Sequence, residues 1–106
     1  LGLAADHLSE FAESYPEHPL SAEALYMLGN IRFSRGEFDD AQVDFFAVSR
    51  QHPDSRFAAG AMLMSARCRE EMGRRKDARS IYLQLVQAYP LSEEAAEANR
   101  RLRSIQ

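Results

Sequence analysis

Hydrophobic residues recur at intervals of three and four along nearly the whole chain, and Pro and Gly interrupt this pattern at regular points. Such spacing is typical of amphipathic helices. The first run predicts a helix that Pro16 ends, and its apolar positions are Leu1, Ala4, Ala5, Leu8, Phe11 and Ala12. Five further runs end near Gly36, Pro53, Gly73, Pro90 and the C-terminus. No stretch alternates with a period of two, so the predicted fold class is all-α, with six helices in antiparallel neighbours.

The residues before three of these runs indicate how the helices begin. Pro19 suits the first turn of the second helix, where its missing N–H would have no helical partner. Asp54 or Ser55 is expected to cap the fourth helix, and Ser92 the sixth, because short polar side chains accept hydrogen bonds from the free N–H groups there.

Residue pairs also recur at a fixed distance along the chain. Tyr15-Pro16, His52-Pro53 and Tyr89-Pro90 are each 37 residues apart, and Gly36 and Gly73 repeat at the same spacing. Both glycines suit the left-handed position that follows a helix. A period between about 20 and 50 residues indicates stacked structural repeats, each of which buries its apolar face against its neighbours.

The residues within each period resemble the tetratricopeptide repeat, a pair of antiparallel helices. In the first complete unit the matching residues are Leu25, Leu28, Gly29, Ala41, Phe45, Val48 and Pro53. In the second they are Met62, Ser65, Ala66, Ala78, Tyr82, Leu85 and Pro90. The resemblance implies a right-handed α-solenoid. Small residues at Gly29, Ala41, Ala66 and Ala78 are expected where two helices cross closely, since larger side chains would overpack the contact.

The resemblance also divides the chain. Residues 1–16 match the second helix of a preceding unit, residues 19–53 and 54–90 are complete repeats, and residues 91–106 form a capping helix. The absent first helix of the half-unit, and Leu1 in place of Met, favour a segment of a longer chain. The capping helix is expected to turn a polar side outward, made of Glu93, Glu94, Glu97, Arg100, Arg101 and Arg103.

The units depart from the common form of this family in two ways. Each is about three residues longer than the usual 34 or so, and Arg32 and Arg69 replace an aromatic residue. The longer repeat period is similar to that of bacterial envelope proteins, notably the Tol–Pal-associated periplasmic coordinator and the lipoprotein of the outer-membrane β-barrel assembly machinery. The periplasm or cell envelope is therefore favoured, with a cytoplasmic or secretion-system scaffold as the alternative.

Tetratricopeptide stacks present a concave groove lined by the first helix of each pair. By resemblance, the groove residues here are Glu23, Tyr26, Asn30, Phe33, Ser34, Leu63, Arg67, Glu70 and Glu71. Two aromatic rings beside an amide and a guanidinium could anchor a peptide or helix of a partner protein. The alternative interpretation is that Tyr26 and Phe33 only pack between helices or at the rim.

Composition favours a binding protein over an enzyme. The net charge of −3 is small and both signs are interspersed, which gives no basic stripe for nucleic acid. His7, His18, His52 and Cys68 lie in different elements without the close pairing of zinc sites, so no metal or other cofactor is implied. Cys68 is expected to be a small buried hydrophobe. No apolar run approaches the roughly 20 residues that span a bilayer, and no nucleophile has an evident base.

These observations predict a non-catalytic scaffold that binds a protein segment in its groove, within a bacterial envelope assembly or another multiprotein assembly. The alternative is a self-association module in which the exposed first helix joins copies of the chain. Neither prediction names the partner.

Overall fold

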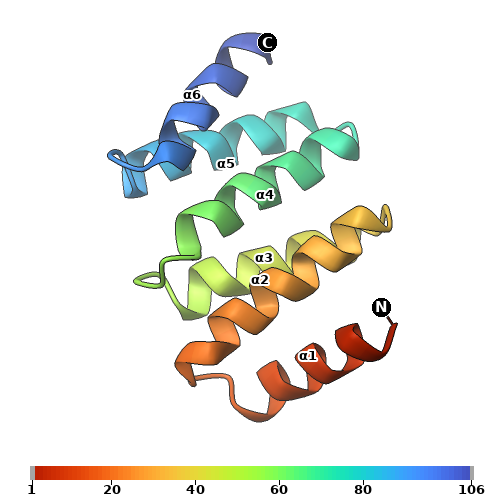
Figure 1. The fold of residues 1–106 in the computed structure, drawn as a ribbon. Coiled ribbons are helices and arrows are strands. Elements are labelled where there is room, and N and C mark those ends of the chain that lie inside the picture. Colours follow the sequence, from red (N-terminus) through yellow and green to blue (C-terminus); the bar gives the residue numbers. More distant parts are fainter. Residues whose placement is uncertain (1, 106) are drawn as a thin grey trace.

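The computed structural model describes residues 2–105, and within that range the secondary structure is entirely helical. Leu1, which the hydrophobic pattern places in the first helix, lies outside the described residues. The helices run antiparallel to their chain neighbours and stack along one direction, from α1 at one end to α6 at the other (Figure 1). Their bounds are α1 (Gly2–Ser14), α2 (Pro19–Ser34), α3 (Phe38–Gln51), α4 (Ala58–Glu71), α5 (Arg75–Ala88) and α6 (Glu93–Ser104). The predicted all-α solenoid is confirmed.

The helix ends follow from local chemistry. Gly36 and Gly73 both adopt a φ of 78°, so the left-handed turns after α2 and α4 are as predicted. Pro19 begins α2, and the ring Nδ1 of His18 accepts the N–H of Leu20 at 3.1 Å. Ser92 caps α6, because its Oγ accepts the N–H of Ala95 at 3.0 Å.

The predicted cap of the fourth helix is wrong. The helix begins at Ala58, and its N-cap residue is Phe57, which has no side-chain capping bond. Ser55 Oγ instead accepts the N–H of Phe57 at 3.1 Å, and Asp54 is exposed. The Ser55 side chain therefore closes a turn in the connection between α3 and α4, before the helix begins.

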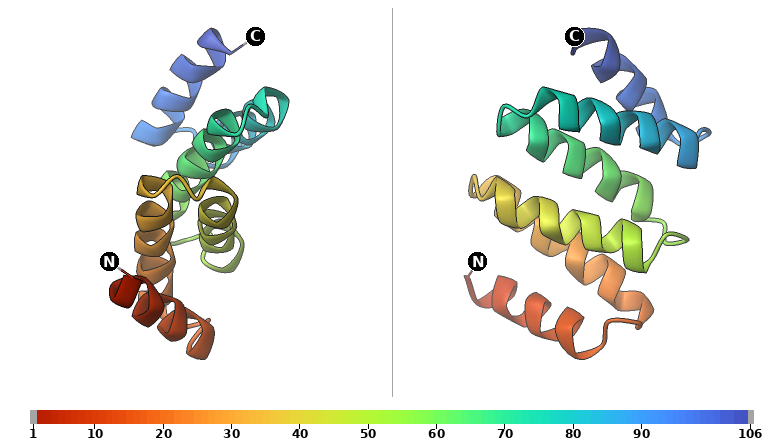
Figure 2. Two further views of the ribbon diagram at one scale, coloured as in Figure 1. Left: turned by 90° about the vertical axis from the view of Figure 1, so that its right-hand side faces the viewer. Right: turned by 180° about the vertical axis from the view of Figure 1, so that it is seen from behind.

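The helices form two layers, with α2, α4 and α6 on one side and α3 and α5 on the other (Figure 2). Each helix packs against the next in the chain, and α4 also touches α2 and α6. Among the described residues, α1, α3 and α5 make no contact with one another. Each repeat consequently meets only its neighbours, which is the arrangement expected of a stacked-repeat protein.

Two hydrophobic clusters form the core of the stack. The first joins α2, α3 and α4 around Phe45 and Val48, and the second joins α4, α5 and α6 around Tyr82 and Leu85. Cys68 is completely buried in the first cluster, as predicted. Within residues 2–105, no helix has the length and apolarity that a membrane crossing requires.

The predicted close crossings are confirmed at the small residues. Ala41, Ala66 and Ala78 have no exposed surface, and Gly29 is buried. A Cβ atom added at Gly29 would lie 2.7 Å from the ring of Phe45. The backbone of α2 therefore approaches α3 closely enough to require glycine at this position.

Candidate functional site

A contact between an aromatic ring and a guanidinium joins α2 to α4 on the face that these helices share. Arg67 of α4 lies over the ring of Phe33 with its guanidinium carbon 5.3 Å from the ring centroid. Phe33 is held from behind by Phe38, whose ring meets it edge-on at 5.0 Å. Arg67 also donates to the sulfur of Met64 at 3.7 Å. Both residues of this pair remain partly exposed, so a ligand can reach them.

Asn30 lies one turn before Phe33 on α2 and is half-buried. Its backbone carbonyl accepts the hydroxyl of Ser34 at 3.0 Å, whereas its side-chain amide has no hydrogen-bond partner among the described residues. A side-chain amide both donates and accepts, which is what a peptide backbone requires of a binding group. Ser34 itself is exposed, and its hydroxyl is occupied by this bond within the helix.

Tyr26 and Leu63 also make contacts between helices. The ring of Tyr26 lies 5.7 Å from that of Phe45 and 5.3 Å from that of Phe57, and its hydroxyl points at Gly60. Leu63 packs against the second hydrophobic cluster. Both side chains are only partly exposed, and their main contacts join neighbouring helices.

The two glutamates at the edges of the predicted set lie apart from Phe33 and Arg67. Glu23 lines a separate cleft between α1 and α2, together with Leu8, Phe11, Leu20, Ala24 and Met27. The cleft has a volume of about 250 Å³. Glu71 is the last residue of α4 and is exposed.

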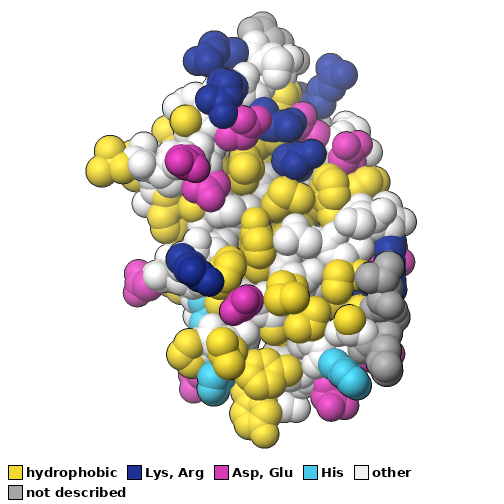
Figure 3. Space-filling model, in the orientation of Figure 1, with side chains coloured by type: hydrophobic (Ala, Val, Ile, Leu, Met, Phe, Trp, Pro, Cys, Tyr) yellow, Lys and Arg dark blue, Asp and Glu magenta, His cyan; other side chains and the backbone are white. Residues whose placement is uncertain are grey.

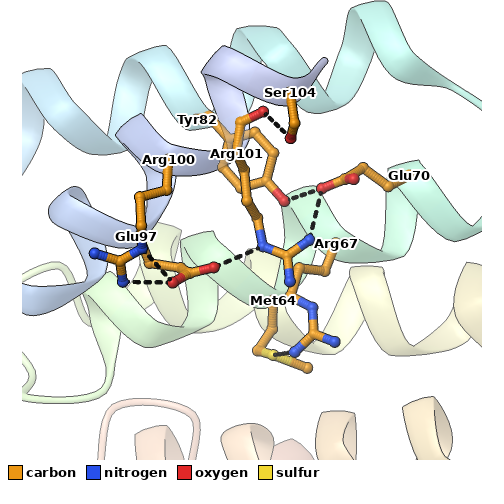
Figure 4. A network of polar contacts seen from close by, with 8 residues as sticks. All are labelled: Met64, Arg67, Glu70, Tyr82, Glu97, Arg100, Arg101 and Ser104. Carbon is orange, nitrogen blue, oxygen red and sulfur yellow. Dashed lines mark hydrogen bonds and ion pairs between the residues drawn. The ribbon is translucent and has the colours of Figure 1, made fainter.

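Glu70 belongs to a polar network that ties α4, α5 and α6 together (Figure 4). The buried hydroxyl of Tyr82 donates to Glu70, and Arg101 approaches the same carboxylate at 3.4 Å. Arg101 also donates to Glu97 at 3.0 Å. Burial and the neighbouring Glu70 carboxylate raise the pKa of Tyr82, so its hydroxyl keeps its proton and donates.

This network corrects one expectation for the capping helix. Arg101 is not on the outward polar side but turns inward to Glu70, with its side chain 32% exposed. Arg100 and Arg103 remain exposed as expected. A long side chain near a helix edge can point either way, and the Glu70 carboxylate on α4 determines the direction here.

An ion pair with a buried carboxylate lies in the first complete helix pair. Arg32 of α2 contacts both carboxylate oxygens of Asp44 of α3 at 3.0 Å, and the Asp44 side chain is only 7% exposed. Burial raises the pKa of Asp44 to about 6, although Arg32 opposes the shift. The role of this pair is structural, because it fixes α2 against α3.

The described residues hold no group of three or more His, Cys, Asp or Glu side chains that could bind a metal ion. The partly exposed residues of α2 and α4 include the amide of Asn30, the guanidinium of Arg67 and the aromatic ring of Phe33. Such groups donate and accept hydrogen bonds and offer apolar contact, which suits recognition of a polypeptide.

Paired helices that stack with a 37-residue period, each packed against its chain neighbours, define a helical-repeat protein. A family model described as tetratricopeptide repeat matches residues 23–55 and 60–92, which is more than half of the chain. The chain therefore belongs to the tetratricopeptide-repeat family. Repeats of this family generally mediate protein–protein interaction, and the family is typically a non-catalytic scaffold. Among curated proteins, none matches the chain significantly.

Proposed function

We propose that this chain is a non-catalytic scaffold that binds a segment of a partner protein across the face formed by α2 and α4. The contact points are Asn30, Phe33 and Arg67. The observation that carries the proposal is the Phe33–Arg67 pair, because it places an apolar surface and unused guanidinium N–H groups side by side on two helices that share one hydrophobic cluster. Of the other predicted residues, Tyr26, Leu63 and Glu70 support these contacts by joining neighbouring helices.

The partner segment is expected to be a peptide or a helix that offers backbone carbonyls or a carboxylate to Arg67 and Asn30. An apolar side chain of the same segment would lie on Phe33. The division of the chain into a half-unit over 1–16, repeats over 19–53 and 54–90 and a capping helix over 91–106 stays a prediction, and it places the binding face in the two complete repeats.

We also propose a bacterial envelope assembly as the setting. Support comes only from the 37-residue repeat, in which Tyr-Pro or His-Pro is followed by Ser and an Ala-rich helix start. The partner would then be another envelope protein, and no insertion of this chain into the membrane is involved.

A capture experiment tests both parts of the proposal. The tagged chain is incubated with separated cytosolic and envelope extracts, captured partners are identified, and their binding to the purified chain is measured by calorimetry. We expect a partner from the envelope extract whose affinity falls at least tenfold in the double variant Phe33→Ala, Arg67→Glu.

A matched control comes from the opposite face of the molecule. Arg50 lies over Phe46 of α3 at 5.6 Å, in the same kind of contact as the Phe33–Arg67 pair. The double variant Phe46→Ala, Arg50→Glu should therefore bind the partner normally. Equal losses in both variants, or a partner found only as further copies of the chain by sedimentation, would overturn the proposal in favour of self-association.

A further inference from the structure

The links between helices lie along two opposite edges of the stack. The turns at Gly36 and Gly73 lie on one edge, and the connections that follow α1, α3 and α5 lie on the other (Figure 2). We call this second edge, residues 15–18, 52–57 and 89–92, the connection edge. In each complete helix pair, α2–α3 or α4–α5, the glycine turn joins the two helices covalently at one end. Only contacts between residues hold the pair together at the connection edge.

The α4–α5 pair is held at both ends. Near its glycine turn, Arg69 of α4 binds Asp77 of α5 at 3.2 Å. At the connection edge, Tyr89 directly follows α5, and its hydroxyl donates to the backbone carbonyl of Pro53, ahead of α4, at 2.6 Å. Burial and the neighbouring Asp54 carboxylate raise the pKa of Tyr89, so the hydroxyl keeps the proton that it donates. This hydrogen bond therefore closes the pair at the end opposite its turn.

His52 occupies the same place in the α2–α3 pair, since it lies 37 residues before Tyr89. Pro16 likewise lies 37 residues before Pro53. The corresponding bond between them is not made, because the buried Nε2 of His52 has no hydrogen-bond partner among residues 2–105. An imidazole ring is smaller than a phenol and carries no hydroxyl, so it does not reach the opposite carbonyl.

A cleft with a volume of about 350 Å³ opens between the two ends that this bond would join. One wall consists of Glu17, Pro19 and Ala22, at the beginning of α2, and the other of residues 51–55 around His52. Figure 3 shows histidine side chains on this side of the molecule, where the connections after α1 and α3 come together. The beginning of α2 thus lacks the tie that the beginning of α4 has.

The ion pair and the closest backbone approach between α2 and α3 both lie toward the Gly36 turn. Arg32 binds Asp44 at 3.0 Å, and the backbone at Gly29 meets the ring of Phe45. Gly29 and Arg32 both belong to the second half of α2. The α2–α3 pair is therefore fixed by specific contacts at its glycine end, whereas the α4–α5 pair is fixed at both ends.

We propose that the α2–α3 pair opens at the connection edge, with the beginning of α2 moving away from the end of α3 about the turn at Gly36. His52 in the place of a tyrosine permits this movement, and Tyr89 prevents it in the α4–α5 pair. The stack therefore bends within its first complete repeat. This movement is independent of the proposed function, since Asn30 and Phe33 lie in the half of α2 that stays fixed.

Hydrogen exchange of two equivalent backbone amides in the whole chain tests this proposal. Ala24 of α2 and Ala61 of α4 are 37 residues apart, and both lie in the half of their helix nearer the connection edge. Local opening lets the helix fray, so that its amides exchange with solvent. After correction for the intrinsic exchange rates, we expect Ala24 to be about fivefold less protected than Ala61, the ratio that one lost hydrogen bond produces.

Removal of the tyrosine hydroxyl shows whether it closes the second pair. Tyr89→Phe should lower the protection of Ala61 about fivefold and leave that of Ala24 unchanged, because the ring and its packing remain. The control is Tyr15→Phe, which removes the hydroxyl of an exposed tyrosine at the third equivalent position and should change neither amide. Unchanged protection of Ala61 in Tyr89→Phe would overturn the proposal.

The reverse substitution shows whether the first pair can be closed. His52→Tyr should raise the protection of Ala24 about fivefold over His52→Phe, since only the tyrosine variant can donate to the Pro16 carbonyl. Circular dichroism checks that both variants keep the helical fold. Equal protection of Ala24 in the two variants would overturn the role of His52, and Ala24 as well protected as Ala61 in the unaltered chain would overturn the opening itself.

Discussion

At the scale of single residues, Arg32 and Arg69 occupy equivalent places in the two repeats but bind different side chains. Arg32 pairs with the buried Asp44, whereas Arg69 binds Asp77 at 3.2 Å and the side chain of Gln42 at 3.1 Å. The position 37 residues after Asp44 is Ile81, so Arg69 has no buried carboxylate to meet. The position 37 residues before Gln42 is Ala5, so Arg32 has no amide across the helix interface. The different partners of the two guanidinium groups therefore follow from the different residues at equivalent positions of neighbouring helices.

The Asp44 carboxyl predicts a pH dependence of stability. Burial raises its native pKa from the ordinary 3.8 to about 6, so between these values the native state holds a proton that the unfolded chain has lost. The free energy of unfolding therefore falls as the pH rises through this window. From the size of the shift, the loss is about 2–3 kcal/mol. We expect the variant Asp44→Asn to lack this loss, measured by urea denaturation at intervals from pH 4 to pH 7.

The control for this measurement is Asp39→Asn, an exposed carboxylate of the same helix, which should keep the full fall in stability. If the Asp44→Asn variant showed the same fall as the unaltered chain, the buried carboxyl would not be its source.

At the scale of helices, the α2–α3 crossing depends on Gly29. An added Cβ would lie 2.7 Å from the ring of Phe45, which is completely buried and has no room to move. Overpacking of this kind costs about 1–3 kcal/mol. We expect Gly29→Ala to lower the free energy of unfolding by that amount in urea denaturation, despite the better helix propensity of Ala.

Gly60 provides the matched comparison for this crossing. A Cβ added there would meet the hydroxyl of Tyr26 at 3.0 Å, at the far end of a partly exposed side chain. A small rotation of Tyr26 relieves that contact, so Gly60→Ala should cost less than Gly29→Ala. If Gly29→Ala lowered the free energy of unfolding by less than Gly60→Ala, α2 and α3 would be able to move apart at this crossing.

The helices themselves could be predicted from the sequence because local signals agree with the packing. Gly36, Gly73 and Ser92 act within a few residues of their own position, and the 37-residue period predicts which helices are neighbours. The direction of Arg101 could not be predicted in this way, because its partner Glu70 becomes a neighbour only after the chain has folded. The turn at Ser55 is local, but a short polar side chain can accept either the N–H of such a turn or that of a helix start, and the sequence does not distinguish the two.

The same reasoning applies to the expected groove residues. Tyr26 and Leu63 stand at equivalent positions in the two repeats, but their contacts with Phe57 and with the second cluster form only between helices of the folded chain. The sequence therefore predicts which helices share this face, but not how far each side chain also packs between them.

At the scale of the whole molecule, each helix packs mainly against its chain neighbours. The buried Cys68 lies in the middle of the stack, so the reactivity of its thiol measures how often that region opens. The thiol is completely buried, and burial raises its pKa to about 12, so the native state holds almost no reactive thiolate at neutral pH. Modification by a thiol reagent therefore requires opening of the first hydrophobic cluster. We expect its rate at pH 7.5 to follow the urea-dependent unfolding measured by circular dichroism.

An exposed thiol serves as the reference for this rate. Ser80→Cys in a Cys68→Ala background places the thiol on the open side of α5 and should react at the rate of a free thiol. Equally fast reaction of Cys68 in the native chain would show that the middle of the stack opens independently of the rest.

The short connection between α2 and α3 has an energetic consequence of its own. Inside the chain α2 is tethered to α3, so it is present at an effective concentration on the order of millimolar or higher without any loss of free translation. The same helix supplied as a separate peptide would lack that tether and would also have to be ordered when it binds. A cut in the turn at Gly36 would therefore weaken the α2–α3 pair even though every side-chain contact between the two helices could still form.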